Sequence, residues 1–220
     1  MDDRTAFPQE NEREILDELQ QAQLLPGLGY YLDVGAGWPL EGSNTYFLYQ
    51  RGWRGLLVEP LSDTWWSTLR YRPGDWLYPI AASNRTGNAV LRVCEHCSSL
   101  EPDWPIQETR SPLIEVAPLS FILNEFPTIR DGCHLCSIDV EGHEKQVLEG
   151  IDFQTFRPLV FIVEALKFSP ALGYDAGGAP ILPVREELWP QWEPILLEAG
   201  YRFYKKTTTG LNRFYLRSDL

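Results

Sequence analysis

The chain has 220 residues, of which 44% are hydrophobic and 23% are charged, so it contains enough apolar material for one packed domain. Its formal net charge of −12 repels phosphate backbones and argues against nucleic acid as the main partner. No apolar run is long enough to span a membrane, and residues 1–13 lack the features of a secretory signal, so we expect a soluble, cytoplasmic protein.

The first predicted element is an amphipathic helix after Asn11. Apolar residues recur at helical spacing from Ile15 to Leu25, and a Pro-Gly pair then ends the helix. Asn11 and Glu14 have the spacing of a capping box. We expect residues 1–28 to form a helical extension and residues 29–220 to form a single main domain.

Downstream, short apolar runs alternate with helical segments. The predicted helices cover residues 43–51, 62–71, 143–149 and 192–199. The apolar runs are YYLDV, RGLLVEP, DWLYPIAAS, HLCSIDV and PLVFIVEA, followed by a C-terminal hairpin of YRFYKK and NRFYLR. This alternation predicts an α/β fold with a mostly parallel sheet and helices on both faces, and the hairpin adds one antiparallel strand.

Two segments rich in proline interrupt this pattern. Residues 101–112, EPDWPIQETRSP, are predicted to form a surface loop. Residues 167–190 are rich in glycine and proline and are predicted to form a loop insertion, a feature that is more often functional than idle.

Carboxylates stand at the ends of four predicted strands: Asp33, Glu59, Asp139 and Glu164. Ligands of open parallel sheets bind outside the carboxyl ends of the strands, so we expect these acids to surround one crevice. For any one of them alone, a solvated residue at the start of a loop is an equal alternative.

The glycine loop after the first strand, DVGAGWPL, separates two classes of ligand. A dinucleotide loop needs a third glycine where Leu40 stands, and Pro39 disturbs the direct step from strand to helix. Asp33 would repel a pyrophosphate and attract a cation. Gly35 and Gly37 allow a ligand to approach the backbone closely.

These features favour S-adenosylmethionine, which combines an adenosine end with a positive end and has no phosphates. Glu59 ends the second strand, where a carboxylate can accept both ribose hydroxyls. A nicotinamide-dependent oxidoreductase on a similar sheet is the minor alternative.

The stretches YLDVGAGWPLEGSNTYFLYQRGWRGLLVEP and SIDVEGHEKQVLEG resemble the FkbM family of S-adenosylmethionine-dependent methyltransferases. The resemblance extends from about residue 30 to GLNRFYLR near the C-terminus. It implies the class I methyltransferase fold, a Rossmann-like seven-stranded sheet whose last strand is antiparallel, with S-adenosylmethionine as the cofactor.

The resemblance also implies where the cofactor lies. Residues on the methionine and sulfonium side would be Asp33, Gly35 and Gly37, with Ser43 and Asn44 nearby. Glu59 would hold the ribose. Ser83 and Asn84 would lie near the adenine, although the acid that many class I enzymes place at that strand end is missing. Asp139 would stand beside the transferred methyl group.

The segment DVEGHE supplies the candidate catalytic residues Asp139, Glu141 and His143. A hydroxyl acceptor must lose a proton during methyl transfer, and either His143 or a carboxylate can act as the base. For His143 and Glu144, the alternative is that they only open the next helix. The predicted activity is O-methylation of a small molecule or a sugar unit; a binding module without catalytic activity is a further alternative.

Two metal sites remain as minority alternatives. Asp139, Glu141 and Glu164 could hold a hard cation such as magnesium. Two CxxC pairs, Cys94 with Cys97 and Cys133 with Cys136, could hold zinc. The spacing in a strand predicts that Cys133 and Cys136 point to opposite faces, which argues against the zinc site, and the main prediction includes no metal.

Overall fold

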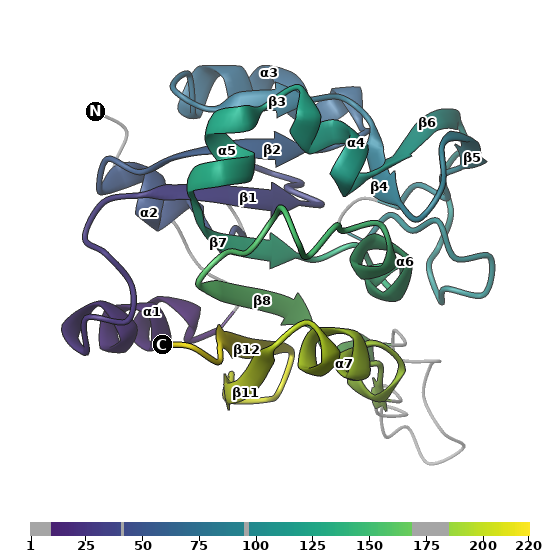
Figure 1. Ribbon diagram of the computed structural model, residues 1–220. Helices are drawn as coiled ribbons and strands as arrows, with labels where there is room; N and C mark the ends of the chain where they lie inside the picture. Colours follow the sequence, from purple (N-terminus) through teal and green to yellow (C-terminus); the bar gives the residue numbers. More distant parts are fainter. Residues whose placement is uncertain (1–9, 41, 95–96, 169–184) are drawn as a thin grey trace, which may run out of the picture.

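The computed structural model describes residues 10–40, 42–94, 97–168 and 185–220. A seven-stranded sheet with the order β11-β12-β8-β7-β1-β2-β3 crosses the molecule, and helices pack on both faces (Figure 1). Its strands are β1 (Tyr30–Val34), β2 (Arg54–Val58), β3 (Trp76–Tyr78), β7 (Cys133–Ile138), β8 (Val160–Glu164), β11 (Tyr201–Lys206) and β12 (Asn212–Arg217).

The sheet is mostly parallel. Neighbouring strands from β3 across to β8 pair in parallel, whereas β12 lies between β8 and β11 and pairs antiparallel with both. The predicted class I methyltransferase fold, with an antiparallel last strand, is therefore confirmed. Because the parallel strands share one direction, their carboxyl ends meet at one edge, at the right of Figure 1.

The sheet divides the apolar core into two layers, and helices cover each of them. One layer receives side chains from α1 (Glu12–Gln21) and α2 (Tyr46–Gln50). The other receives side chains from α4 (Leu119–Asn124), α5 (Pro127–Gly132), α6 (Glu144–Glu149) and α7 (Trp189–Glu198). Helix α3 (Ser62–Tyr71) matches its predicted bounds. In the part of the chain that the structure describes, no helix is long and apolar enough to cross a membrane.

Helix α1 packs on the sheet through Ile15, Leu16 and Leu19, which are all buried. The capping box predicted at its start does not form. The Asn11 side chain instead accepts hydrogen bonds from the backbone and hydroxyl of Thr208, so it ties the helix to the C-terminal hairpin.

The apolar run DWLYPIAAS is not one strand. Pro79 separates β3, which pairs with β2, from β4 (Ala81–Ser83), which joins a second sheet with the order β4-β6-β5. The other strands of this second sheet are β5 (Gly87–Val90) and β6 (Leu113–Pro118). Proline lacks the N–H that a central strand donates, which explains the break. The sequence analysis also missed β6 and the two short helices that follow it.

The predicted insertion at residues 167–190 lies mostly outside the described residues. Its two ends are described: β9 (Leu166–Phe168) and β10 (Arg185–Glu187) pair antiparallel. This two-stranded ladder begins two residues after Glu164, the last residue of β8.

Strands β1 and β2 pack so closely that Gly55 has no room for a side chain. A Cβ atom at Gly55 would lie 2.0 Å from the Tyr31 ring and 2.6 Å from the Tyr31 carbonyl oxygen. Overpacking of this kind costs about 1–3 kcal/mol, so Gly55→Ala should lower the melting temperature by several degrees. Gly27→Ala is the matched control, because a Cβ there meets nothing within 4 Å. Equal melting temperatures for the two variants in thermal unfolding would contradict this packing.

Candidate active site

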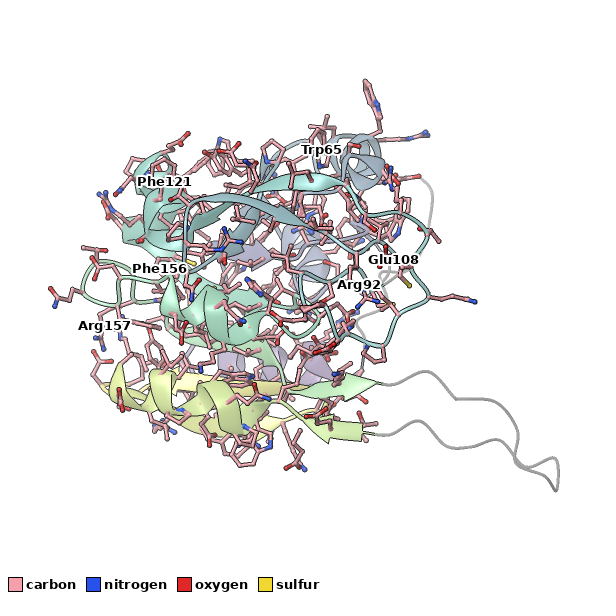
Figure 2. All side chains as sticks on the ribbon, turned by 90° about the vertical axis from the view of Figure 1, so that its right-hand side faces the viewer. Trp65, Arg92, Glu108, Phe121, Phe156 and Arg157 are labelled. Carbon is pink, nitrogen blue, oxygen red and sulfur yellow. The ribbon has the colours of Figure 1, made fainter. Side chains whose placement is uncertain are left out.

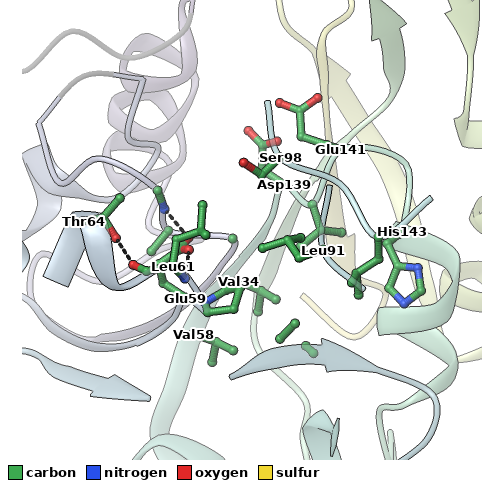
Figure 3. Close-up of a pocket in the computed structure, with 18 of the residues that line it drawn as sticks. Val34, Val58, Glu59, Leu61, Thr64, Leu91, Ser98, Asp139, Glu141 and His143 are labelled. Carbon is green, nitrogen blue, oxygen red and sulfur yellow. Dashed lines mark hydrogen bonds between the residues drawn. The ribbon is translucent and has the colours of Figure 1, made fainter. Parts of the chain in front are cut away.

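A cavity opens at the carboxyl ends of the parallel strands (Figure 3). Figure 2 looks onto this edge of the molecule. The empty space measures about 1030 Å³, part of it open to solvent. Val34 and Val58, from the ends of β1 and β2, line it together with the glycine loop, while Leu91 and Leu100 line it from the segment after β5. Such a mixture of apolar walls and a few polar groups is typical of small-molecule sites.

Six of the predicted site residues line this cavity, and five do not. The six are Gly35, Gly37, Glu59, Asp139, Glu141 and His143. The five that do not line it are Asp33, Ser43, Asn44 and Ser83, which are buried, and Asn84, which is exposed.

Glu59 follows the last residue of β2 and is fixed by the backbone around it. Its two carboxylate oxygens accept hydrogen bonds from the backbone N–H groups of Gly37, at 2.9 Å, and Leu61, at 2.8 Å. The side chain is buried, and this desolvation raises the pKa of Glu59 to about 7, although both hydrogen bonds act in the opposite direction. Each oxygen keeps a lone pair for a further donor from the cavity.

The two glycines of the DVGAG loop serve different purposes. A Cβ at Gly35 would lie 1.8 Å from the carbonyl oxygen of Asp139, so this glycine permits close contact between the ends of β1 and β7. At Gly37 the nearest atom to a Cβ is the Gly35 carbonyl oxygen, at 3.9 Å. Both residues have positive φ angles, +78° and +51°, which glycine adopts without strain. Gly37 is thus the glycine that keeps the cavity open.

Asp33 points away from the cavity, contrary to the expectation that it lines the methionine side. Side chains alternate along a strand, and Val34 occupies the cavity side of β1. The Asp33 carboxylate lies 3.6 Å from the Arg72 guanidinium and accepts a hydrogen bond from Thr45. Burial raises the pKa of Asp33, and Arg72 and Thr45 oppose this effect.

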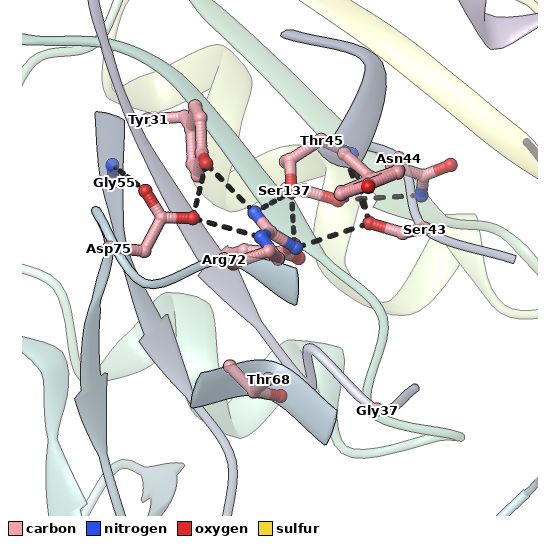
Figure 4. A network of polar contacts seen from close by, with 12 residues as sticks. Tyr31, Gly37, Ser43, Asn44, Thr45, Gly55, Thr68, Arg72, Asp75 and Ser137 are labelled. Atoms are coloured by element: carbon pink, nitrogen blue, oxygen red, sulfur yellow. Dashed lines mark hydrogen bonds and ion pairs between the residues drawn. The ribbon is translucent and has the colours of Figure 1, made fainter. Parts of the chain in front are cut away.

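Arg72 is the centre of a buried polar network (Figure 4). Its guanidinium donates to Asp75 at 2.8 Å, to the Tyr31 hydroxyl at 2.9 Å and to Thr45 at 2.7 Å. It also lies 3.4 Å from the Ser43 hydroxyl. The network joins β1, the end of α3 and the segment before α2, so it supports the cavity wall from behind.

Ser83 and Asn84 contact other side chains rather than the cavity. The Ser83 hydroxyl lies 2.9 Å from His143 Nε2, and His143 Nδ1 lies 2.6 Å from the Glu101 carboxylate. Asn84 donates to Glu149 at 2.8 Å. Both ring nitrogens of His143 therefore have partners, and the ring is held in place between two elements.

Hydrogen bonds from Ser99 and Trp104 hold the acidic loop that follows β7. The Glu141 carbonyl accepts from the Ser99 hydroxyl at 2.6 Å, and its carboxylate accepts from the Trp104 indole at 3.1 Å. Glu141 has a φ angle of +54°, a conformation that is strained for a residue other than glycine. Burial, followed by the charges of Asp139 and Glu144, raises the pKa of Glu141 well above its usual value.

Glu144 closes this loop from the start of the next helix, the position given to it by the alternative that it only opens that helix. Its carboxylate accepts from the backbone N–H groups of Val140 and Gly142, each at 3.1 Å. Burial raises the pKa of Glu144 to about 7. Glu144 is the first residue of α6 and does not line the cavity.

The segment predicted as a surface loop, residues 101–112, contributes to the site. Trp104 is buried and packs so closely on Gly142 that a Cβ there would lie 2.5 Å from the indole. Arg92 holds this segment by donating to the carbonyls of Glu101, Pro102 and Trp104. The signal in the sequence was a tryptophan, a residue that is rarely left in solvent, within an otherwise polar stretch.

The prediction that Cys133 and Cys136 point to opposite faces was wrong. An irregularity in the β1–β7 pairing adds His134 as an extra residue, so both cysteines enter the same buried core layer. Cys94 and Cys97 lie with their sulfurs 2.8 Å apart beside the cavity. Among the described residues, which exclude His96, no group of three or more metal-ligating side chains includes a cysteine.

The family model for the methyltransferase FkbM domain matches residues 33–203. A search of curated proteins found no match. Among solved structures, the chain is similar to the 1,6-didemethyltoxoflavin-N1-methyltransferase of Burkholderia thailandensis, solved with 1,6-didemethyltoxoflavin and S-adenosylhomocysteine bound.

That structural similarity is distant. The TM-score is 0.42 and the sequence identity 12%, with 97% of this chain and 77% of that chain covered. The family match is the stronger finding, because it spans most of the chain and contains the glycine loop, Glu59 and the DVEGHE segment. This protein belongs to the FkbM family of methyltransferases, and its cofactor is S-adenosylmethionine.

Proposed function

We propose that S-adenosylmethionine lies across the cavity with its ribose on Glu59 and its sulfonium towards Asp139 and Glu141. The observation that carries this proposal is the buried Glu59 carboxylate, which two backbone N–H groups hold at the cavity wall. A carboxylate fixed in this way accepts two hydroxyl donors at no cost of reorganisation. Figure 3 shows Glu59 on one side of the cavity and the two other acids on the opposite side.

The acceptor in this proposal is a hydroxyl group of a small molecule or a sugar unit. The hydroxyl oxygen attacks the methyl carbon, the carbon–sulfur bond breaks, and the sulfur leaves as a neutral thioether. The hydroxyl proton must pass to a base. Asp139 and Glu141 line the cavity with carboxylates that can orient the hydroxyl and accept this proton.

In this proposal, His143 and the buried residues among the remaining predictions act through other residues and do not contact the cofactor. His143 is a positioning residue, because Glu101 and Ser83 engage both of its ring nitrogens. Ser83 therefore acts on the cavity through His143. Asp33, Ser43 and Asn44 support the glycine loop from the buried side rather than contacting the cofactor.

Two of the earlier alternatives have less support. Membership of the FkbM family and the absence of a third glycine in the loop disfavour a nicotinamide-dependent oxidoreductase. A binding module without catalytic activity would not require a group of acids at the acceptor end of the cavity. Measurement of turnover distinguishes such a binding module from a methyltransferase.

Cofactor affinity should depend on pH through Glu59. The ionised carboxylate accepts the ribose hydrogen bonds, and it predominates only above its pKa of about 7. The affinity for S-adenosylhomocysteine, measured by calorimetry, should therefore fall about tenfold between about pH 8 and pH 6. Glu59→Gln should bind weakly at both values.

The control for this measurement is Glu198→Gln, which changes an exposed acid on α7. It should bind S-adenosylhomocysteine as the unaltered protein does, with the same dependence on pH. A constant affinity of the unaltered protein across this range would contradict the role of Glu59.

Alanine substitutions should separate the two glycines of the loop. Gly35→Ala should prevent stable folding, because its Cβ would overlap the Asp139 carbonyl oxygen at 1.8 Å. Gly37→Ala meets no such overlap and should fold, at a cost of about 1–2 kcal/mol for its left-handed conformation. Its methyl group enters the cavity, so its affinity for S-adenosylhomocysteine should fall at least about tenfold. Thermal unfolding and calorimetry measure both effects; a stable Gly35→Ala would refute the proposed packing.

Asp139 should be needed for turnover but not for cofactor binding. Methyl transfer from labelled S-adenosylmethionine to a panel of monosaccharides and other hydroxyl compounds should fall by about 100-fold or more in Asp139→Asn. The affinity for S-adenosylhomocysteine should change little. Methylated nitrogen in the products would contradict the hydroxyl acceptor, and cofactor binding without transfer to any compound would favour the binding module.

A further inference from the structure

Three carboxylates meet at the acceptor end of the cavity. Asp139 follows β7 and Glu164 ends β8, and these strands pair with Ile138 opposite Val163. Glu141 reaches the same place from the loop after Asp139. Each of the three residues offers a carboxylate oxygen, and these oxygens all lie within 4.8 Å of one another.

Glu164 has an unusual environment for an acid. Its side chain is buried, with only 4% of its surface exposed, and its Oε2 atom has no hydrogen-bond partner among the described residues. A buried carboxylate oxygen without a partner is costly, because no water compensates for the lost solvation. This atom indicates that Glu164 lacks a positively charged or donor group in the part of the chain that the structure describes.

The largest electrostatic influences on Glu141 and Glu164 come from other acids. Burial and the charges of neighbouring carboxylates raise the pKa values of both residues, and no basic residue is among the largest causes of either shift. The Trp104 indole is a neutral donor to Glu141. The nearby Lys167 lies over the Trp104 ring and 3.8 Å from Glu186 instead.

We propose that Asp139, Glu141 and Glu164 bind a divalent cation that prefers oxygen ligands, such as Mg²⁺ or Mn²⁺. Carboxylate oxygens are the protein ligands that hard cations prefer. Two oxygens on opposite sides of Mg²⁺ are about 4.0–4.2 Å apart. The three carboxylate oxygens lie within 4.8 Å of one another, so only small side-chain shifts would bring them to this distance. The cation would lie beside the Glu164 oxygen that lacks a partner among the described residues, and it would offset the negative charge of the cluster.

The cation also gives the acceptor a place to bind, an inference that rests on the proposed function. Asp139 and Glu141 line the cavity, so the open coordination positions face the space where the acceptor would lie. An acceptor with two neighbouring hydroxyls could complete the coordination. A hydroxyl bound to the cation would lose its proton more easily, and a carboxylate of Asp139 or Glu141 would accept that proton through the oxygen that does not bind the cation. The hydroxyl oxygen then attacks the methyl carbon as the carbon–sulfur bond breaks and the sulfur leaves as a neutral thioether.

A shared proton is the competing explanation for the cluster. Glu144 and Glu164 lie close enough to interact through their side chains, and one proton between them would also relieve the repulsion. In that case the cluster has no need of a metal ion. The two explanations differ in whether the protein binds a divalent cation in the absence of cofactor and acceptor.

Direct measurement of manganese binding tests the proposal. The full-length protein is freed of metal with a chelator and titrated with Mn²⁺ up to about 1 mM, and bound ion is followed by electron paramagnetic resonance. We expect one site per chain, with competition by Mg²⁺. Glu164→Gln should weaken binding at least about tenfold. Its control is Glu193→Gln, because Glu193 already pairs with Arg213 and should not affect the site.

Thermal unfolding provides a second measurement, which begins with the unaltered protein. Mg²⁺ should raise the melting temperature of the unaltered protein more than NaCl at equal ionic strength does, and Glu164→Gln should lose this difference. The absence of Mn²⁺ binding, or equal binding by Glu164→Gln and Glu193→Gln, would overturn the proposal. The affinity for S-adenosylhomocysteine is measured separately, so a failure of the metal site and a failure of the proposed cofactor site can be told apart.

Discussion

The close contact between Gly35 and the Asp139 carbonyl positions the two functional ends of the cavity. Asp139 donates its backbone N–H to Val34 at 3.0 Å, and Gly35 donates to Val58 at 2.9 Å. The ends of three neighbouring strands are thereby fixed against one another at the backbone. Glu59 follows the last residue of β2, Asp139 follows the last residue of β7, and the two face the cavity from opposite sides. Between them, the ends of β1 and β7 approach so closely that Gly35 has no room for a side chain.

Buried ionic groups lie on both sides of this arrangement. The Arg72 network behind the cavity satisfies its own charges, since Asp33 and Asp75 lie beside the guanidinium. The acidic cluster at the acceptor end contrasts with it, because Glu164 retains an oxygen without a partner. A paired network specifies structure, whereas an incomplete one is expected where a ligand completes it.

The sequence predicted those features that follow from periodicity and strand order. The apolar runs and the C-terminal hairpin covered all seven strands of the large sheet, although one run joined β3 to β4. The acids one residue beyond strand ends, Glu59 and Asp139, do line the cavity. Asp33 differs because it lies within its strand, where alternation turns it away from the cavity. Contacts between distant segments left no local pattern, so the role of Arg72 emerged only in three dimensions. The sequence could have marked Trp104 as a buried residue, but it could not have indicated its contacts with Gly142 and Glu141.

The antiparallel ladder of β9 and β10 has a consequence for how the specificity of this protein can change. Both of its strands adjoin the end of β8, and Leu188 donates its backbone N–H to the Ala165 carbonyl directly after Glu164. The two strands therefore lie at the proposed acceptor end, on the far side of the cavity from Glu59. Substitutions in β9 and β10 would alter the surroundings of the acceptor without disturbing the cofactor side. A protein with this arrangement can change its acceptor while it keeps the same methyl donor.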